Sequence, residues 1–392
     1  MLLWGGQVVS TLGSMASQVI YPLLILALTD SPTAAGFAAA LRFVPYLVFS
    51  LPVGALIDRW DRKRVMLWSD IGRAVAVGTI PVAIALDALT LMQVYLVCFI
   101  EGSFFVFFNI AEVAALPKVV PRSQLPEATA VNEAGFGVAG ILGPPMGTFL
   151  FQVLGHAVPF VSQVLTYLVS FASLTAIRTS FKAEVAAPRH DLAAEIAEGI
   201  RWLWSKPLIR FMAFLTGGIN LVNAAVPLAI IVLAKELGAS DTEIGIIFSI
   251  AGAGAIVGSL VGGRIQRSFT FGQVIAASVW ISAASFLMLA AVPGFIWIGV
   301  VASVYFFVGP IYNVVQFSYR VALIPDELQG RVNSIFRLIC FSFMPIGAAL
   351  GGLMIEELGV RTAVGVCAGI FFTLAALTSI NRHVREAAPL AK

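Results

Sequence analysis

The chain has 392 residues, of which 59% are hydrophobic and only 11% are charged. A water-soluble protein of this length needs more charged surface, so the composition excludes a soluble globular protein and indicates a chain solvated by lipid. The net charge is only +3. We therefore expect the lipid bilayer, and no nucleic acid, among its partners.

Apolar stretches recur along the whole sequence, and each is long enough to cross a hydrocarbon core about 30 Å thick as a helix. A membrane β-barrel would show strands of alternating polarity, which are absent from the sequence. The sequence predicts an all-α membrane protein with twelve transmembrane helices, at residues 2–28, 33–57, 65–86, 89–114, 129–154, 157–177, 207–233, 242–263, 271–292, 295–318, 331–356 and 361–381.

Basic residues orient these spans. With the N-terminus inside, about 19 of the 24 Lys and Arg residues fall in cytoplasmic segments, and only Lys235 and Arg361 fall outside. We expect a multi-pass protein of the inner (plasma) membrane with both termini cytoplasmic. The first span lacks a charged n-region and is expected to remain in the mature protein, although a missing N-terminal segment stays open.

The three cysteines and three histidines lie far apart in the sequence. Their spacing predicts neither a disulfide framework nor a metal site, and no cofactor is expected.

Span one carries a polar stripe. Gln7, Thr11, Ser14 and Gln18 follow one another at intervals of four, three and four residues, which places them on one helical face. Because polar groups facing lipid are unfavourable, we expect this face to point into the protein.

Between spans two and three lies the segment GALIDRWDRKR. Gly54 would permit close helix approach, and Asp58 would face the positive N-terminus of a helix from the other half of the chain. Arg59 belongs to the basic cluster, and Arg62 is expected to pair with Glu112 at the end of span four. Such contacts would latch the two halves in one conformation. The alternative for the basic cluster is that it only follows the rule that cytoplasmic loops are rich in Lys and Arg.

Span four contains Glu101, close to the middle of the membrane by its distance from both ends of the segment. An ionised acid at this depth is unfavourable, so Glu101 is the first candidate to bind and release a coupling proton. Arg42 in span two lies at comparable depth and is its expected partner; a purely structural ion pair is the alternative. Glu133 in span five is a weaker proton candidate.

Span five contains GILGPPMG. Gly140, Gly143 and Gly147 are spaced for tight helix packing, and Pro144 removes a backbone hydrogen bond and favours a kink. The alternatives are ordinary helix packing and a role in closing a cavity.

The polar interval around residues 178–206 separates six spans from six. We expect an N-terminal bundle at 1–177, a cytoplasmic linker with an amphipathic helix at 178–206, and a C-terminal bundle at 207–392. VGALIDR reappears as VGGRIQR at an offset of 208 residues, which indicates internal duplication.

Spans seven and ten of the second half are also polar on one face. Tyrosine, asparagine, glutamine and threonine side chains occur there at helical spacing: Thr216, Asn220, Asn223, Tyr305, Tyr312, Asn313, Gln316 and Tyr319. Hydrogen bonding between helices is the alternative to substrate contact for each of them.

GALIDRWDRKR resembles the loop signature of the major facilitator superfamily, with Asp61 in place of a glycine, as in the macrolide-efflux and enterobactin-exporter-like branch. GILGPPMG resembles the motif associated with exporters. The resemblance implies that spans one, seven and ten line a central cavity, which would suit an amphipathic organic substrate.

We therefore expect a monomeric secondary transporter, not an enzyme, that exports a small amphipathic molecule in exchange for protons by alternating access. The acids well inside spans all lie in the first half, so proton coupling is expected there and substrate contact mainly in the second. A proton-coupled uptake carrier is the nearer alternative, and a membrane enzyme, sensor or scaffold the more distant one.

Overall fold

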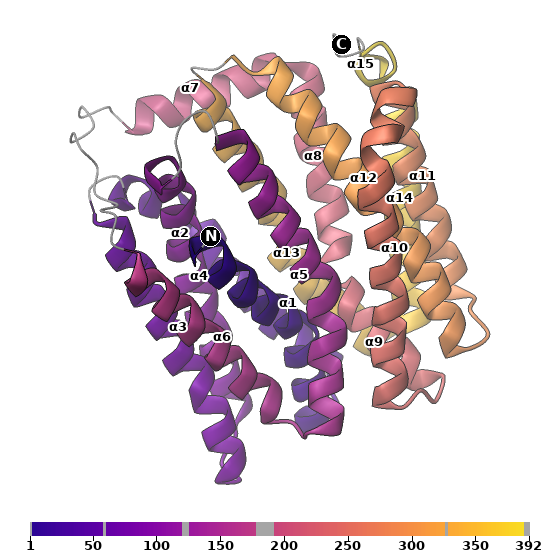
Figure 1. Ribbon diagram of the computed structural model, residues 1–392. Helices are drawn as coiled ribbons and strands as arrows, with labels where there is room; N and C mark the ends of the chain where they lie inside the picture. Colours follow the sequence, from indigo (N-terminus) through magenta and orange to yellow (C-terminus); the bar gives the residue numbers. More distant parts are fainter. Residues whose placement is uncertain (1, 58–59, 120–124, 178–191, 326–327, 388–392) are drawn as a thin grey trace. The chain divides into compact units, whose positions relative to one another are not determined.

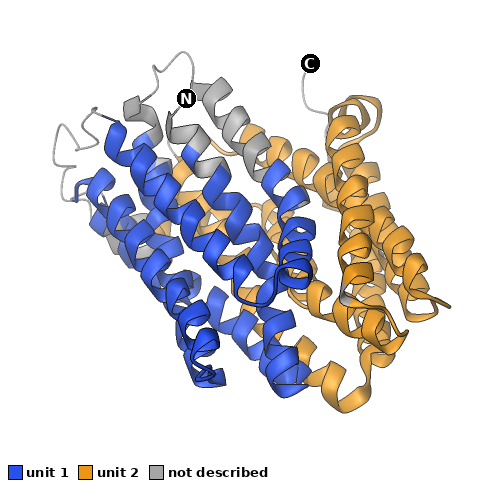
Figure 2. Cartoon of the chain, turned by 60° about the horizontal axis from the view of Figure 1, so that its bottom comes forward, with its two compact units in different colours: residues 1–189 blue, residues 190–392 orange. Residues whose placement is uncertain are grey.

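The computed structural model describes residues 2–57, 60–119, 125–177, 192–325 and 328–387, which form helices joined by short turns (Figure 1). The chain divides into two compact units, Met1–Arg189 and His190–Lys392 (Figure 2). The first unit contains α1 (Leu2–Thr29), α2 (Pro32–Ile57), α3 (Arg62–Ala85), α4 (Leu91–Val119), α5 (Leu125–Val153) and α6 (Val158–Ala176).

The second unit begins with the amphipathic helix α7 (Leu192–Ser205), which packs against α13. The remaining helices are α8 (Pro207–Asn223), α9 (Val226–Glu236), α10 (Asp241–Ser268), α11 (Phe271–Ala290), α12 (Phe295–Leu323), α13 (Gln329–Leu358), α14 (Val360–Ile380) and α15 (Arg382–Arg385).

Membrane-spanning length is a property of most of these helices. Within the described residues, 11 segments are long and apolar enough to cross a membrane, and α5 adds a shorter apolar section, Val138–Val153. No β-strand occurs in the described part of the chain. The prediction of an all-α membrane protein is confirmed.

The seventh predicted span differs from the continuous helix that we expected. It consists of α8 and α9, separated at Ala224 and Ala225, although Pro207–Glu236 together form one apolar span. In an unbroken helix the ring of Pro227 would collide with the carbonyl of Asn223, four residues earlier. Placing Pro227 in the first turn of a new helix removes that collision.

Short turns are closed by local side chains. Asp30 and Asp87, which lie in the turns after α1 and α3, have φ angles of 50° and 51°, a region that Asp tolerates better than most residues. Ser240 and Thr270 form capping boxes with Glu243 and Gln273 at the starts of α10 and α11. These caps stop one helix and start the next within a few residues.

The packing scheme of the first unit recurs in the second. In the first, α1 packs on α5 and α6, α2 on α4, and α3 on α4 and α6. In the second, α8 packs on α13 and α14, α10 on α12, and α11 on α12 and α14. The matching partners agree with the internal duplication expected from the repeated sequence.

Glycines lie at close helix crossings in both units. A Cβ on Gly102 of α4 would collide with the carbonyl oxygen of Arg42 on α2. In the second unit, Cβ atoms on Gly254 and Gly258 of α10 would collide with the carbonyl oxygens of Ser303 and Phe307 on α12. At these points the two backbones touch because no side chain separates them.

Candidate functional site

A buried acid lies among α1, α2, α4 and α6 of the first unit. The side chain of Glu101 is only 2% exposed, and Arg42 Nη2 lies 3.1 Å from Glu101 Oε1. Gln163 Nε2 donates to the same oxygen at 2.9 Å, and the Tyr167 hydroxyl donates to it at 2.8 Å. Arg42 Nη2 also donates to the backbone carbonyl of Ser14, at 3.1 Å. We call these five residues the Glu101 network.

The hydrogen bonds to Glu101 are concentrated on one oxygen. Oε1 accepts three donors, whereas Oε2 is buried without a hydrogen-bond partner in the described part of the chain. The amide oxygen of Gln163 is likewise buried and without a donor. A buried polar atom left without a partner costs about 1–3 kcal/mol, so this arrangement has an unmet demand for one additional hydrogen.

Gly102 explains why Arg42 reaches Glu101. The absence of a side chain at position 102 lets α2 and α4 cross with their backbones in contact at Arg42. Because Glu101 precedes Gly102 in α4, this crossing places the Glu101 side chain beside Arg42 of α2. A larger residue at 102 would separate the two helices and lengthen the ion pair.

A second buried ion pair adjoins the Glu101 network. Arg73 Nη2 lies 2.5 Å from Asp70 Oδ1, and both side chains are almost completely buried, at 2% and 0% exposure. The Arg73 guanidinium carbon lies 4.5 Å from the ring centroids of both Phe108 and Tyr167. Tyr167 therefore contacts both pairs, with its ring on Arg73 and its hydroxyl on Glu101.

The polar residues of α1 have different surroundings. Ser14 is buried and lies 3.4 Å from the Tyr167 hydroxyl, whereas Thr11 is half-buried. Gln18 is exposed and its amide contacts the sulfur of Met15 at 3.3 Å. The side chain of Gln7 lies outside the described residues. Among the described side chains of this stripe, Ser14 alone contacts the other residues of the Glu101 network.

In the second unit, most of the predicted cavity residues bond to one another or to backbone. Tyr312 and Thr216 hydroxyls are 2.7 Å apart, and the Tyr305 hydroxyl donates to the Asn223 side-chain oxygen. Asn220 donates to the carbonyl of Cys340 at 3.1 Å.

Two neighbouring residues of α12 complete this part of the second unit. Gln316 is buried, with its amide nitrogen unsatisfied in the described structure, whereas Asn313 is exposed. Among the described cavity residues, Gln316 therefore retains an unused buried donor.

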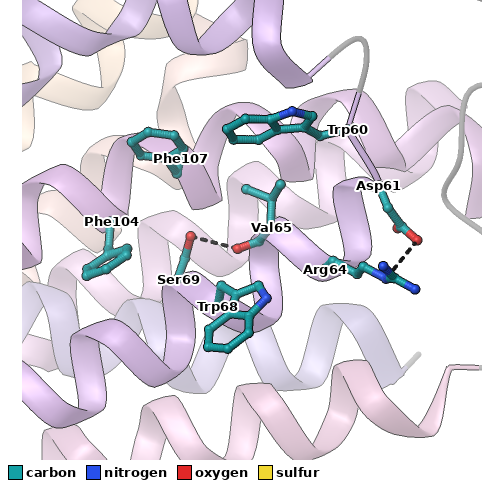
Figure 3. Close-up of a pocket in the computed structure, with 8 residues that line it drawn as sticks. All are labelled: Trp60, Asp61, Arg64, Val65, Trp68, Ser69, Phe104 and Phe107. Atoms are coloured by element: carbon teal, nitrogen blue, oxygen red, sulfur yellow. Dashed lines mark hydrogen bonds and ion pairs between the residues drawn. The ribbon is translucent and has the colours of Figure 1, made fainter.

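A pocket of about 530 Å³ lies beside the first turns of α3 (Figure 3). Four of its eight lining residues are aromatic, and the pocket was not expected from the sequence. The lining residues are Trp60, Asp61, Arg64, Val65, Trp68, Ser69, Phe104 and Phe107. Trp68 is 70% exposed, and Val75 and Val82, one and two heptads further along α3, are also exposed. Such an apolar stripe is typical of a helix face in contact with lipid, so the pocket is expected to open toward the bilayer.

Known proteins resemble the whole chain. A family profile described as a transmembrane secretion effector matches residues 1–391. The chain belongs to this family, a branch of the major facilitator superfamily. Its members are transporters and not enzymes.

Several relatives are named for efflux. Macrolide efflux protein A of Streptococcus pyogenes is 25% identical over 367 residues, covering 92% of this chain and 90% of that protein. Multidrug efflux pump Tap of Mycolicibacterium fortuitum is 24% identical and covers 89% and 87%. The enterobactin exporter EntS of Escherichia coli (strain HS) is 26% identical and covers 95% and 89%.

Solved transporters share the fold. The nucleoside transporter NupG has a TM-score of 0.75 at 13% identity, covering 96% of this chain and 97% of NupG. A bacterial homologue of the iron transporter ferroportin has a TM-score of 0.68 at 14% identity, covering 96% and 98%. At these identities the similarity identifies the major facilitator fold alone.

The predicted gate residues of the transporter are only partly described. Asp58, Arg59 and the side chain of Glu133 lie outside the described residues. Arg62 and Glu112 are both half-buried, and their mutual pairing stays a prediction.

A Cβ at Gly54 would meet no described atom within 4 Å, and close helix approach at this glycine stays a prediction. On the same helix, Val53 and Ile57 occupy the face that packs into the core of the first unit.

Span five of the transporter packs through two of its three glycines. Cβ atoms on Gly143 and Gly147 would come within 2.6 and 2.8 Å of the Cβ atoms of Met15 and Ala16 on α1. Gly140 has no described neighbour within 4 Å, so the expected tight contact at that position is not found. Pro144 lies inside the helix, and its carbonyl accepts a hydrogen bond from Thr148 at 2.7 Å.

Sequence reasoning missed Gln163 and Tyr167 of α6. Their four-residue separation, continued by the buried Ser170, forms a polar face on an otherwise apolar span. This pattern was a usable signal, comparable to the stripe on span one.

Proposed function

We propose that this transporter exports small amphipathic organic molecules in exchange for protons, and that Glu101 is the residue that binds the coupling proton. Macrolide, multidrug and enterobactin exporters among its relatives support the direction of transport. The asymmetric surroundings of the Glu101 carboxylate support the assignment of the proton site.

The chemistry follows from the two carboxylate oxygens. With Glu101 ionised, Oε1 is stabilised by Arg42, Gln163 and Tyr167, while Oε2 remains buried without a donor. A proton on Oε2 turns that oxygen into a donor, and the Gln163 amide oxygen is a buried acceptor without a donor, on a residue already bonded to Glu101. Protonation thus supplies the hydrogen that the ionised site lacks.

Protonation also changes the charge balance. Neutral Glu101 no longer holds the positive charge of Arg42, whose side chain is only 17% exposed. A buried cation that loses its anion is destabilised by several kcal/mol, which favours a conformation in which Arg42 reaches water or another partner. In alternating access, proton entry from one side of the membrane and release to the other would drive this change of conformation.

We further propose that both termini lie on the cytoplasmic side of the inner membrane. The strong excess of Lys and Arg in the loops assigned to that side supports this orientation. A phosphatase reporter fused after Lys392 should be inactive; an active, externally folded reporter would reverse the assignment.

Export is tested in inverted membrane vesicles with an imposed inward-acidic proton gradient and a panel of fluorescent amphipathic dyes. The parent protein should accumulate dye, and dissipating the gradient should abolish accumulation. Glu101→Gln should lose gradient-driven accumulation, whereas Glu357→Gln, which removes an exposed acid of α13, should retain it.

Full activity of Glu101→Gln would refute the proton assignment. Dye uptake only in right-side-out vesicles would instead favour an uptake carrier, and no movement of any dye in either orientation would favour a sensor or scaffold.

A further inference from the structure

An arginine of α12 is buried without an anion. Arg320 is 7% exposed, and in the described part of the chain it forms no ion pair. Its Nε is buried without a hydrogen-bond acceptor. Its guanidinium carbon lies 4.0 Å from the ring centroid of Phe336 on α13, which holds the guanidinium plane in place.

A second unused donor lies one helical turn away. Gln316 is 6% exposed, and its amide nitrogen is also buried without an acceptor. Residues four apart on a helix are neighbours on one face, so the free donors of Gln316 and Arg320 lie side by side. Tyr312, a further turn along, continues the same face and bonds to Thr216 of α8.

Among the described residues, the electrostatic contacts around Arg320 add positive charge and include no carboxylate. Arg337 of α13 is close enough to act electrostatically on Arg320. The described ion pairs of the second unit engage Glu198 and Glu236 with other arginines. Leaving a buried cation and an amide donor unsatisfied costs several kcal/mol, a cost that a bound anion would remove.

Long side chains connect this face of α12 to two further helices. In the described structure α12 packs closely on α10 and α11, whereas it reaches α8 and α13 through long side chains, as in the Tyr312–Thr216 and Arg320–Phe336 contacts. Aromatic rings beside free donors suit a molecule that is partly apolar and carries a negative group.

We propose that Arg320 and Gln316 form a binding site for the anionic group, a carboxylate, sulfonate or phenolate, of an amphipathic aromatic molecule. The role of that molecule as exported substrate rests on the function proposed above; the site itself does not. The inference narrows the substrate class from amphipathic compounds in general to organic anions.

Binding is tested first, without transport. The purified full-length protein, in nanodiscs of zwitterionic phosphatidylcholine, is titrated with fluorescein and with rhodamine 123, which share a xanthene ring system but carry opposite charge. We expect the parent to bind fluorescein in preference to rhodamine 123. Arg320→Gln should weaken fluorescein binding about tenfold or more, because a hydrogen-bonded charge is lost.

Two further variants keep the test decisive. Gln316→Leu removes the amide donor at similar size and should weaken fluorescein binding severalfold even if Arg320→Gln fails to fold. Arg264→Gln removes an exposed arginine of α10 in the same unit and should leave binding unchanged. Preference for rhodamine 123, absence of fluorescein binding, or affinities within twofold of the parent in both site variants would overturn the site.

Transport then separates the two proposals. If fluorescein binding depends on Arg320 but vesicles move neither dye, the export function fails and the anion site stands. If vesicles export rhodamine 123 and fluorescein binding ignores Arg320, export stands and the anion site fails.

Discussion

The buried pair of Asp70 and Arg73 provides a quantitative test of the first unit. Removing one partner of a buried ion pair typically destabilises a protein by about 3–5 kcal/mol, since the remaining charge is left uncompensated. The two single substitutions should nevertheless differ. After Asp70→Asn, Arg73 keeps its contacts with the rings of Phe108 and Tyr167, each worth about 0.5–2 kcal/mol.

After Arg73→Gln, by contrast, Asp70 is a buried anion with no such ring contacts described. We therefore expect a loss of stability of about 3 kcal/mol for Asp70→Asn and of about 5 kcal/mol for Arg73→Gln. The double variant should be more stable than Arg73→Gln alone, because it leaves no buried charge.

The assay is thermal unfolding in detergent, with the fraction of monodisperse protein measured by fluorescence-detected size exclusion at each temperature. The parent should have the highest apparent Tm. Asp70→Asn and the double variant should follow at similar values, and Arg73→Gln should have the lowest. Equal stability of parent and Arg73→Gln would refute the reasoning, as would a double variant whose loss equals the sum of the single losses.

Two further substitutions examine the geometry around Glu101. Gly102→Val should lower the apparent Tm and abolish gradient-driven dye accumulation, because its side chain would meet the Arg42 carbonyl. Gly54→Val, with no described neighbour within 4 Å, is the control and should keep the parental Tm. A stable and active Gly102→Val protein would contradict the close crossing of α2 and α4. Tyr167→Phe keeps the ring over Arg73 but loses the hydroxyl bonded to Glu101, so we expect a stability loss of about 1–2 kcal/mol and slower accumulation, and parental values in both measurements would show that this hydrogen bond is unimportant.

Much of the fold follows from hydropathy, because a lipid-solvated helix must be apolar over a fixed length. Counting from the ends of the segments also set Arg42 and Glu101 at similar depth, and the structure brings their side chains to 3.1 Å. Depth alone does not give the direction in which a side chain points around the helix axis. The packing of Val53 and Ile57 into the core of the first unit was therefore not predictable from depth.

Other features were inaccessible from depth and charge. Asp70 and Arg73 lie three residues apart on α3, and the packing of α3 against α4 and α6 buries their ion pair almost completely. Arg320 was placed beyond the end of its span at residue 318, whereas α12 continues to Leu323 and turns Arg320 inward. Helix ends are set by local capping and tertiary packing, which an average hydropathy does not contain.

The glycine crossings of α10 on α12 determine how the second unit can deform. Where backbone touches backbone, at Gly254 and Gly258, no rotamer is available to absorb a sliding motion, so displacement of one helix must either carry the other along or break the whole contact. We therefore expect α10 and α12 to move together as one rigid body. A molecule bound at Arg320 on α12 should thus shift α10 as well.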